Sequence, residues 1–584
     1  MAAAIMERRI VLALSIAIAL TRFLAVAQSL CDWDEALFAL GVRDYEVAEH
    51  HPHPPGYPLF IAAAKLVAVT GLDEFRSLQV IVVLGAMFIF PALYWLAREI
   101  GFDFTTAVGG AAVYAFLSNV WVYGGTGFSD VPATAIVFVG CALLLRGRTD
   151  VRAYIAGAVV LGIAAGFRPA NLFVGAVPAL MATWMQFRAK SYRAIAAAMF
   201  LGLAVVAGSY LGAALASRSI ADYIWIVRDQ STYVREIDSW RNPGRGSLYD
   251  AAKTFMLRPF GQKDVLNALA LAAAMSVIAA LVRRRMQPLL TFAIFTPLAV
   301  TTWLNLDINT PGRYAIGYLP MHALLAADGF LLFGRKAQIA LCSAVVLVFI
   351  AWTWPALEMQ RETDAPAVAA MKWVRDNAPA STPVYVHAGY GPQASYVLAG
   401  RPVHFFENVE EIPPEHGHSW LVDWRLREGG HTFIRPRKTL WKVLRQRSFE
   451  ASVTPASTLL RFGGGWHELE GTPSRSYRWM NKEGVVLLPS IRGAGIVTLR
   501  IYLQVDSLPP PIIVDVLWNG APIDRITSSV AEVERSWTLQ SREGAANELR
   551  LVTNKTVVPA TRGNSRDTRA LGLRLDRLSW TPVH

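Results

Sequence analysis

Long apolar segments recur through the first 355 residues of this 584-residue chain. Most of them have the roughly 17–25 residues that a helix needs to cross about 30 Å of hydrocarbon. We predict eleven transmembrane helices, at residues 10–29, 77–97, 104–120, 128–146, 153–169, 170–187, 194–215, 264–282, 288–304, 314–333 and 338–355. The chain is therefore predicted to be a polytopic α-helical membrane protein.

The composition excludes a wholly soluble protein. Hydrophobic residues make up 53% of the chain and charged residues 17%, whereas soluble domains carry about 25% charged residues. The net charge of +12 fits Lys and Arg at the cytoplasmic ends of membrane helices. The sequence shows no basic stripe with interleaved aromatic residues, the pattern typical of a nucleic-acid-binding surface. Three scattered cysteines, Cys31, Cys141 and Cys342, predict no disulfide framework.

The charges between the predicted helices indicate an orientation. With a cytoplasmic N-terminus, the Arg and Lys residues of the short connections face the cytoplasm, as the positive-inside rule requires. The long connections 30–76 and 216–263, and everything after residue 356, then lie outside the cytoplasm. Pro58–Thr70 is short and contains Lys65, so we expect it to lie at the membrane interface. The predicted location is a cell (inner) membrane.

The sequence changes character near residue 356. Residues 1–355 form the predicted membrane domain, residues 356–455 a mixed α/β region, and residues 456–584 a β-sandwich. The sandwich prediction depends on alternating apolar residues in Val497–Gln504 and Ile512–Trp518, the second followed by the turn signal Asn519-Gly520. Both C-terminal regions are predicted to be extracytoplasmic.

Three carboxylates follow directly on the first predicted helix. The segment reads Cys31-Asp32-Trp33-Asp34-Glu35. Carboxylates beside a membrane surface suit a general base that takes a proton from an acceptor hydroxyl or amine. They also suit the start of a helix, where acidic side chains complement the helix dipole and Asp32 is a candidate cap. The sequence leaves both interpretations open.

The same connection continues as His50-His51-Pro52-His53-Pro54-Pro55-Gly56-Tyr57-Pro58, which predicts a rigid, turned segment. A metal site at these histidines is conceivable, but their spacing fits no specific zinc pattern. A second acidic residue, Asp130, lies at the outer end of the predicted helix 128–146. It is a candidate site residue because ionisable groups near membrane depth are usually functional, and equally a candidate helix cap.

Two arginines lie at outer helix ends. Arg168-Pro169 ends the fifth predicted helix, and Arg313-Tyr314 opens the tenth. A guanidinium at a membrane surface binds phosphate well through its two-pronged geometry. The alternative for each is a side chain that reaches toward lipid headgroups.

Together these motifs resemble the GT-C superfamily of integral membrane glycosyltransferases, especially the protein O-mannosyltransferases and the bacterial aminoarabinose lipid A transferases. The resemblance covers residues 1–355. Its most specific element is Asp34-Glu35, and the next is His53-Pro54-Pro55. Residues 356–584 resemble neither the small tail of the lipid A transferases nor the inserted soluble domain of the protein O-mannosyltransferases. Trp466, Trp479 and Trp518 there are either sugar-stacking residues of a carbohydrate-binding module or, more commonly for such positions, core residues.

The resemblance implies an enzyme that transfers a sugar from a polyprenyl-phosphate donor to a lipid, glycan or protein acceptor at the outer face, by an inverting single displacement. Asp34 would be the base or the carboxylate that positions the acceptor, with Glu35 beside it and Asp130 as the second acidic residue. Arg168 and Arg313 would bind the donor phosphate. The substrate-binding set implied by the motifs is completed by His53 and Tyr57.

Cofactor use stays open. No cofactor is certain, but Asp32-Trp33-Asp34 is also a DxD motif, and some superfamily members use such a pair with a divalent metal, here Mg²⁺ or Mn²⁺ bound by Asp32 and Asp34. Two other functions remain as alternatives. A polyprenyl-linked glycan ligase or polymerase would share the many helices and outer arginines, and a transporter would need inverted repeats, which the sequence does not show.

Overall fold

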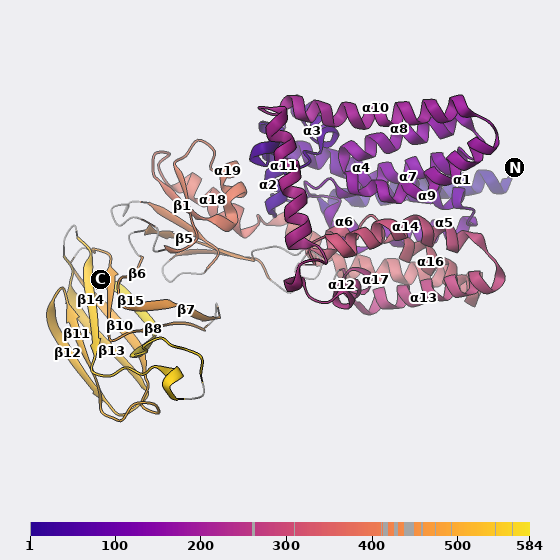
Figure 1. Cartoon of the computed structure of the whole chain (residues 1–584). Helices are drawn as coiled ribbons and strands as arrows, with labels where there is room; N and C mark the ends of the chain where they lie inside the picture. Colours follow the sequence, from indigo (N-terminus) through magenta and orange to yellow (C-terminus); the bar gives the residue numbers. More distant parts are fainter. Residues whose placement is uncertain are drawn as a thin grey trace. The chain divides into compact units, whose positions relative to one another are not determined.

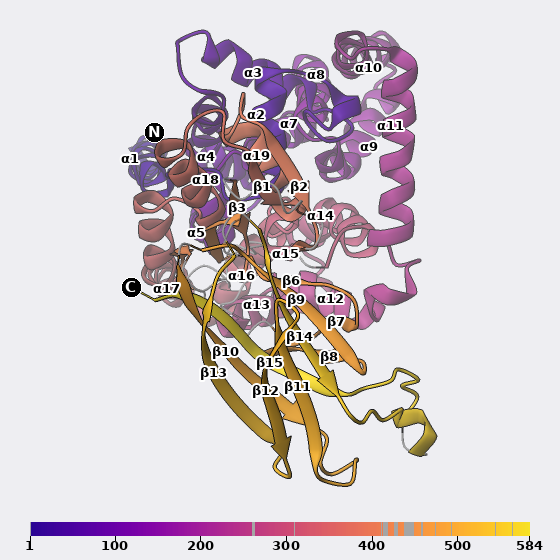
Figure 2. The ribbon, with the colours of Figure 1, turned by 90° about the vertical axis from the view of Figure 1, so that its left-hand side faces the viewer.

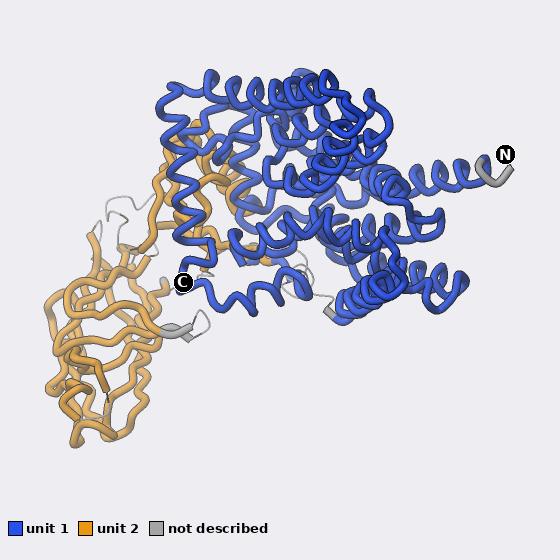
Figure 3. Tube along the Cα trace, turned by 45° about the vertical axis from the view of Figure 1, so that its right-hand side comes forward, with its two compact units in different colours: residues 1–368, 435–449 blue, residues 369–434, 450–584 orange. Residues whose placement is uncertain are grey.

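The computed structural model describes residues 2–259, 263–308, 310–409, 412, 419–425, 430–436, 449–456, 459–472, 475–491, 493–542, 545–562 and 565–583. The chain forms two compact units (Figure 3). Unit 1 comprises Met1–Val368 and Arg435–Phe449, and unit 2 comprises Ala369–Ile434 and Glu450–His584. The domain boundary predicted at residue 355 lies inside a helix that continues to Glu362.

Unit 1 is built from helices that run largely side by side (Figure 1). They are α1 (Ala2–Arg22), α2 (Trp33–Arg43), α3 (Pro58–Ala68), α4 (Glu74–Ile100), α5 (Phe104–Phe116), α6 (Ser118–Tyr123), α7 (Asp130–Arg146), α8 (Val151–Phe167), α9 (Leu172–Arg188), α10 (Tyr192–Ala216), α11 (Ile220–Tyr233), α12 (Leu248–Leu257), α13 (Lys263–Arg283), α14 (Met286–Asn305), α15 (Pro311–Tyr314), α16 (Pro320–Phe330) and α17 (Arg335–Glu362).

Every segment predicted to span the membrane is helical over most of its length. Among the described residues, six helices are long and apolar enough to cross a membrane by length and composition. They are Glu74–Ile100, Pro169–Arg188, Tyr192–Ala216, Asp264–Arg283, Met286–Asn305 and Arg335–Asn377. The chain is therefore a multi-pass membrane protein, while the count of eleven stays a prediction. At 11 residues, α3 is only about 16 Å long.

Two predicted boundaries are wrong for a common reason. The first helix ends at Arg22 and not at residue 29, because the backbone beyond it bonds to other segments: Ala27 N–H donates to Gly125 O (2.9 Å) and Gln28 N–H to Gln360 O (2.8 Å). The predicted helix 314–333 is likewise broken, since α15 ends at Tyr314 and α16 begins only at Pro320. Tertiary hydrogen bonds override the apolar pattern at the first place, and at the second Pro320 begins a new helix.

Helix ends position several polar residues together at one end of the bundle. Asp130 is the first residue of α7, and Arg168 directly follows α8, which runs back alongside α7. The helix α2 begins beside Asp34, and α15 carries Arg313. The opposite end holds the C-terminus of α7 at Arg146 and the start of α17 at Arg335.

Unit 2 begins with a mixed sheet of order β2-β1-β3-β5-β4. Its strands are β1 (Val384–His387), β2 (Val403–Phe406), β3 (Trp420–Asp423), β4 (His431–Ile434) and β5 (Glu450–Pro455). The strand β1 pairs in parallel with β2 and β3, and β5 pairs antiparallel with β3 and β4. Helices α18 (Pro366–Asn377) and α19 (Gly391–Val397) precede and follow β1, so this region is mixed α/β.

The rest of unit 2 is two five-stranded sheets (Figure 2). One has the order β13-β10-β15-β8-β7 and the other β12-β11-β14-β9-β6. The strands are β6 (Arg461–Phe462), β7 (Trp466–Thr472), β8 (Arg475–Met480), β9 (Glu483–Leu488), β10 (Ala494–Leu503), β11 (Ile512–Trp518), β12 (Ala521–Ser528), β13 (Glu532–Gln540), β14 (Asn547–Thr553) and β15 (Leu573–Pro582).

A single apolar core joins the two sheets. Alternate residues such as Leu499, Ile501, Val514 and Val516 are almost fully buried in it, because successive side chains of a strand point to opposite faces. Asn519 and Gly520 take positive φ values of 52° and 86° between β11 and β12, as the turn signal predicts.

The three tryptophans considered for sugar stacking all contact this core. Trp518 is only 7% exposed, and Trp466 and Trp479 pack against the same core while half-buried. The indole of Trp518 donates to Gln540 O (3.0 Å) and that of Trp466 to Val485 O (3.0 Å). Buried indoles usually find such a partner. Trp518 is therefore a core residue, and Trp466 and Trp479 lie at the edge of the same core.

Candidate functional site

Asp32 and Glu35 form the start of α2. The Asp32 side chain accepts from Asp34 N–H (3.3 Å), and Glu35 reaches back to Asp32 N–H (3.1 Å). This is a capping box, in which two backbone donors at a helix start are satisfied reciprocally. The helix-cap interpretation is therefore correct for Asp32.

Glu35 also ties two connections together. Its carboxylate is fully buried and accepts from Cys31 N–H (2.7 Å) and from Gly127 N–H (2.7 Å), which belongs to the connection before α7. Burial raises the pKa of Glu35, and the hydrogen bonds from Cys31 and Gly127 oppose that rise. Because its oxygens face backbone donors, Glu35 holds the site residues in place and is a positioning residue.

Asp34 points instead toward Arg313. One carboxylate oxygen accepts from Arg313 Nη1 at 2.6 Å, and the Arg313 guanidinium also donates to the hydroxyl of Tyr314 (3.0 Å). Arg313 lies over the Phe128 ring at 4.6 Å from its centroid, a geometry that stabilises a buried cation. The Asp34 side chain keeps 24% of its surface exposed, so a substrate group has access to it.

Asp130 and Arg168 form a second ion pair. Asp130 Oδ1 lies 3.2 Å from Arg168 Nη2, and both side chains are buried. Arg168 also contacts Ser129 Oγ (3.4 Å) and lies about 6 Å from the ring centroids of Tyr57 and Tyr314. Since Arg313 stacks on the same Tyr314, the two pairs are neighbours.

His53 and Tyr57 complete the cluster. His53 Nε2 and the Tyr57 hydroxyl are hydrogen-bonded at 3.0 Å, and the Phe38 ring packs against both. Burial lowers the pKa of His53 to about 4 despite the nearby Asp34 carboxylate, and burial raises the pKa of Tyr57 to about 12. At neutral pH both side chains are therefore uncharged and able to donate or accept hydrogen bonds.

The two guanidinium groups control the charge on Asp34. Burial alone would raise the pKa of Asp34, but the positive charge of Arg313, followed by His53 and Arg168, outweighs it and holds the pKa well below its usual range. Asp34 is therefore an ionised carboxylate in the ligand-free protein.

Three buried polar atoms of the cluster have no hydrogen-bond partner among the described residues. They are Asp130 Oδ2, Arg313 Nε and His53 Nδ1. A buried polar atom without a partner costs about 1–3 kcal/mol. Such atoms at one place in a structure indicate binding capacity that the protein itself does not use.

The residues do not fit the metal site suggested by the DxD motif. Asp34 faces Arg313 and Asp32 caps α2. No group of three or more His, Cys, Asp or Glu side chains in the described part of the chain is arranged to hold a metal ion. A divalent ion at Asp34 would also lie against two guanidinium groups, whose charge repels it.

The structure thus brings together Asp34, Asp130, His53, Tyr57, Arg168 and Arg313, and places Glu35 behind them. Sequence reasoning missed Phe38, Phe128 and Tyr314. Tyr314 was quoted only as the neighbour of Arg313, and no motif marks the phenylalanines, whose role appears only when the helices pack.

The fold and this cluster define a class: a multi-pass helical membrane protein with a β-rich C-terminal unit and a cluster of paired acids and arginines at one end of its helices. No protein-family model and no curated protein matches the sequence. The search of solved structures finds ArnT from Cupriavidus metallidurans in the apo state, with 13% identity and a TM-score of 0.47 over 77% of this chain and 98% of that chain.

The search also finds the structure of the same ArnT in complex with undecaprenyl phosphate, with 12% identity and a TM-score of 0.45 over 76% of this chain and 97% of that chain. A third match is the Archaeoglobus fulgidus oligosaccharyltransferase in complex with zinc and sulfate (10% identity, TM-score 0.44, 98% of each chain). At such low identities and TM-scores, the likeness carries no inference about the chemistry of this chain.

Proposed function

We propose that the protein is a membrane glycosyltransferase that moves a sugar from a polyprenyl-phosphate donor to a lipid, glycan or protein acceptor. The observation that carries the proposal is the Asp34–Arg313 pair, 2.6 Å apart, beside the Asp130–Arg168 pair. Glycosyl transfer from a lipid phosphate needs a base for the acceptor and cations for the departing phosphate. The cluster offers both within one group of side chains.

The proposed reaction is an inverting single displacement. The acceptor oxygen or nitrogen forms a bond to the anomeric carbon while the bond from that carbon to the phosphate oxygen breaks. The acceptor proton passes to the Asp34 carboxylate, and polyprenyl phosphate leaves with the electron pair. Its charge is met by the guanidinium groups of Arg168 and Arg313, whose forked geometry suits phosphate.

Donor binding also activates the base in this scheme. In the ligand-free protein Arg313 holds the pKa of Asp34 well below its usual range, which makes Asp34 a weak base. A donor phosphate that binds Arg313 competes with Asp34 for it and so raises the pKa of Asp34. The base then becomes effective only when donor is bound.

An apolar groove between α4 and α7 supports a lipid-linked donor. It measures about 410 Å³ and begins beside the cluster, at Pro132 and Phe167, then follows α4 past Phe88 to Trp95. Its lining is almost wholly apolar, so it suits a prenyl chain whose phosphate reaches Arg168. Ile136→Trp, which narrows this groove, should raise the KM for donor. Leu203→Trp, on the exposed face of α10, should not.

The experiment that tests the function measures transfer from labelled polyprenyl-phosphate sugars in membranes that contain wild type or Asp34→Asn. Loss of a general base should lower the rate about 10²–10⁴-fold. The matched control is Asp328→Asn, the same change at a second Arg-paired aspartate, which is buried at the opposite end of the bundle. Wild-type transfer by Asp34→Asn would exclude Asp34 as base. Substrate flux without transfer would favour the transporter alternative.

The orientation is part of the proposal. We place the cluster and unit 2 outside the cytoplasm, with a cytoplasmic N-terminus, in a cell (inner) membrane. In support, the helix ends opposite the cluster carry Arg146, Arg283 and Arg335, as the positive-inside rule expects. A C-terminal reporter active only in the cytoplasm would overturn this orientation.

A further inference from the structure

A second cavity lies at the opposite end of the bundle from Asp34. It measures about 450 Å³ and lies among the C-terminal ends of α4, α7 and α9. Since Asp130 opens α7 and Arg146 closes it, the cavity is about 24 Å from the acid–arginine cluster along that helix. It is lined by Glu99, Leu145, Arg146, Arg148, Thr149, Met181, Trp184 and Met185.

The two arginines of this cavity have no carboxylate partner among the described residues. Arg148 bonds only to backbone oxygens, those of Leu145 (2.6 Å) and Glu99 (3.4 Å), and Arg146 is exposed. The one acid, Glu99, accepts from the indole of Trp95 (3.1 Å). The lining therefore carries a net positive charge that the protein leaves uncompensated.

The opposite wall of the cavity is apolar and belongs to a membrane-spanning helix. Met181, Trp184 and Met185 come from α9, and Trp184 is 60% exposed. Tryptophan is enriched at the level of lipid headgroups. A free inorganic anion would gain nothing from this wall, whereas the glycerol and first acyl carbons of a lipid would pack against it.

We propose that this cavity binds the headgroup of a monoanionic phospholipid such as phosphatidylglycerol. The phosphate lies between Arg146 and Arg148, the headgroup hydroxyls reach Glu99 and Thr149, and the acyl chains leave along Trp184. Basic pockets between membrane helices on the cytoplasmic side bind anionic headgroups in this way. The site uses no residue of the acid–arginine cluster or of the apolar groove, and only its place on the cytoplasmic side rests on the proposed orientation.

The test is native mass spectrometry of the full-length protein purified with equal amounts of phosphatidylglycerol, phosphatidylethanolamine and phosphatidylcholine. Wild type should retain one phosphatidylglycerol in preference to the other two lipids. Arg146→Gln should lower that preference about fivefold, the effect of one arginine near an anionic surface, and Arg148→Gln should act similarly. Arg188→Gln, an exposed arginine in the last turn of α9 outside the cavity, should retain the wild-type preference.

Three outcomes would overturn the proposal. Equal retention of all three lipids would show no headgroup selection. Equal retention of phosphatidylethanolamine and phosphatidylglycerol would assign the cavity to a zwitterion held by Glu99. Displacement by soluble glycerol 3-phosphate as efficient as displacement by phosphatidylglycerol would show that the apolar wall contributes nothing and that the ligand is a free phosphate. Folding of each variant is checked by its thermal unfolding in detergent.

Discussion

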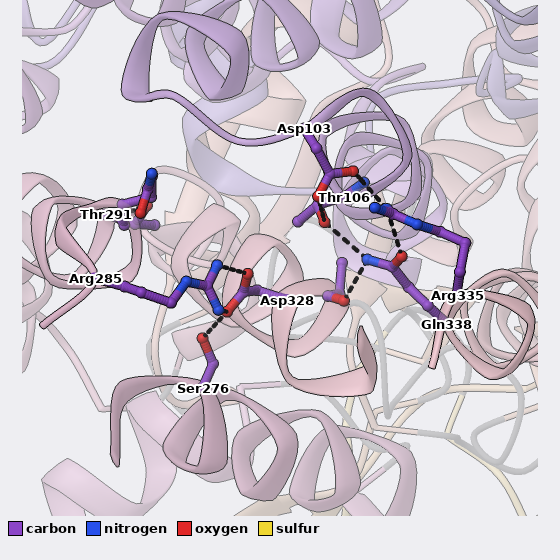
Figure 4. Close-up of polar contacts among 10 residues, drawn as sticks. Asp103, Thr106, Ser276, Arg285, Thr291, Asp328, Arg335 and Gln338 are labelled. Atoms are coloured by element: carbon purple, nitrogen blue, oxygen red, sulfur yellow. Dashed lines mark hydrogen bonds and ion pairs between the residues drawn. The ribbon is translucent and has the colours of Figure 1, made fainter. Parts of the chain in front are cut away.

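Both ends of the helical bundle bury aspartate–arginine pairs, but the two ends differ in how fully those pairs are satisfied. At the end opposite the cluster, Asp328 accepts from Ser276 Oγ (2.7 Å) and from both Nη atoms of Arg285 (2.6 and 3.2 Å). Nearby, Arg335 joins Asp103 to Gln338, and Gln338 donates to Thr106 (Figure 4). None of these described side chains has a buried nitrogen or oxygen atom without a hydrogen-bond partner.

The cluster around Asp34 leaves part of its hydrogen-bonding capacity unused. Asp130 Oδ2, Arg313 Nε and His53 Nδ1 are buried without a hydrogen-bond partner, although their neighbours are charged. A closed polar network fixes the packing of helices, whereas an open one costs stability and is retained where a ligand completes it. The comparison therefore separates a closed polar network from one of the same residue types that keeps unused hydrogen-bonding capacity, where we propose that the ligand binds.

Among the variants that compare the two ends, removal of an arginine at the open end should have the largest effect. Arg168→Gln should lower transfer about 10²–10³-fold, comparable with the loss of one preorganised donor at a transition-state charge. Arg285→Gln, the same change in the closed network, should alter transfer by less than about threefold per folded molecule. Initial rates with saturating acceptor check this. Equal losses in both variants would remove the functional distinction between the two ends.

Glu35→Gln should have the next largest effect, and it should act on stability. An amide has one acceptor oxygen, so a backbone N–H of Cys31, Asp32 or Gly127 would lose its partner. We expect a loss of about 1–3 kcal/mol in the free energy of unfolding. Transfer by the folded fraction should fall much less than in Asp34→Asn. A transfer defect as large as that of Asp34→Asn, with unchanged thermal unfolding, would make Glu35 catalytic.

Asp328→Asn should have a smaller effect on stability. The amide oxygen still accepts one bond, and Arg285 remains 30% exposed and can be hydrated. We expect a loss of about 1 kcal/mol in the free energy of unfolding. Thermal unfolding in detergent, compared with wild type at equal lipid content, measures it. An unchanged midpoint would show that the closed network is not a stabilising lock.

The sequence predicts local features of this molecule well and pairings poorly. The helices, the Asn519-Gly520 turn and the possible Asp32 cap depend on neighbouring residues, and all of them appear in the structure. Asp34 and Arg313 are 279 residues apart, and no local pattern joins them.

The sequence around Asp328 carries a signal for a buried ion pair. Asp328 is an ionisable residue inside the predicted span 314–333, and such residues usually have a partner. Its partner Arg285 belongs to the run Arg283-Arg284-Arg285, which was interpreted only as an orientation signal. The closed network was therefore predictable as a need for a counter-charge, although the identity of that counter-charge was not.

The last prediction is that transfer activity does not depend on pH near neutrality. Arg313 keeps the pKa of Asp34 below its usual range, and burial lowers the pKa of His53 to about 4. Neither group titrates between about pH 5 and 8 in the free protein, so kcat/KM, which reports free-enzyme ionisations, should stay flat there. An acid limb near pH 6.5 that disappears in His53→Gln would contradict this expectation.

Stability should behave differently over the same range. Because the pKa of His53 is lower in the folded state than in the unfolded chain, the unfolded state binds more protons between about pH 6.5 and pH 4. The free energy of unfolding should therefore fall as pH falls through that window, and His53→Gln should lose this dependence. Asp34 contributes the same sign, but only below about pH 4, where its unfolded form becomes protonated. A stability that declines while kcat/KM per folded molecule stays constant would assign the titration of His53 to folding, with no change in the charge of the cluster in the free, folded protein over that range.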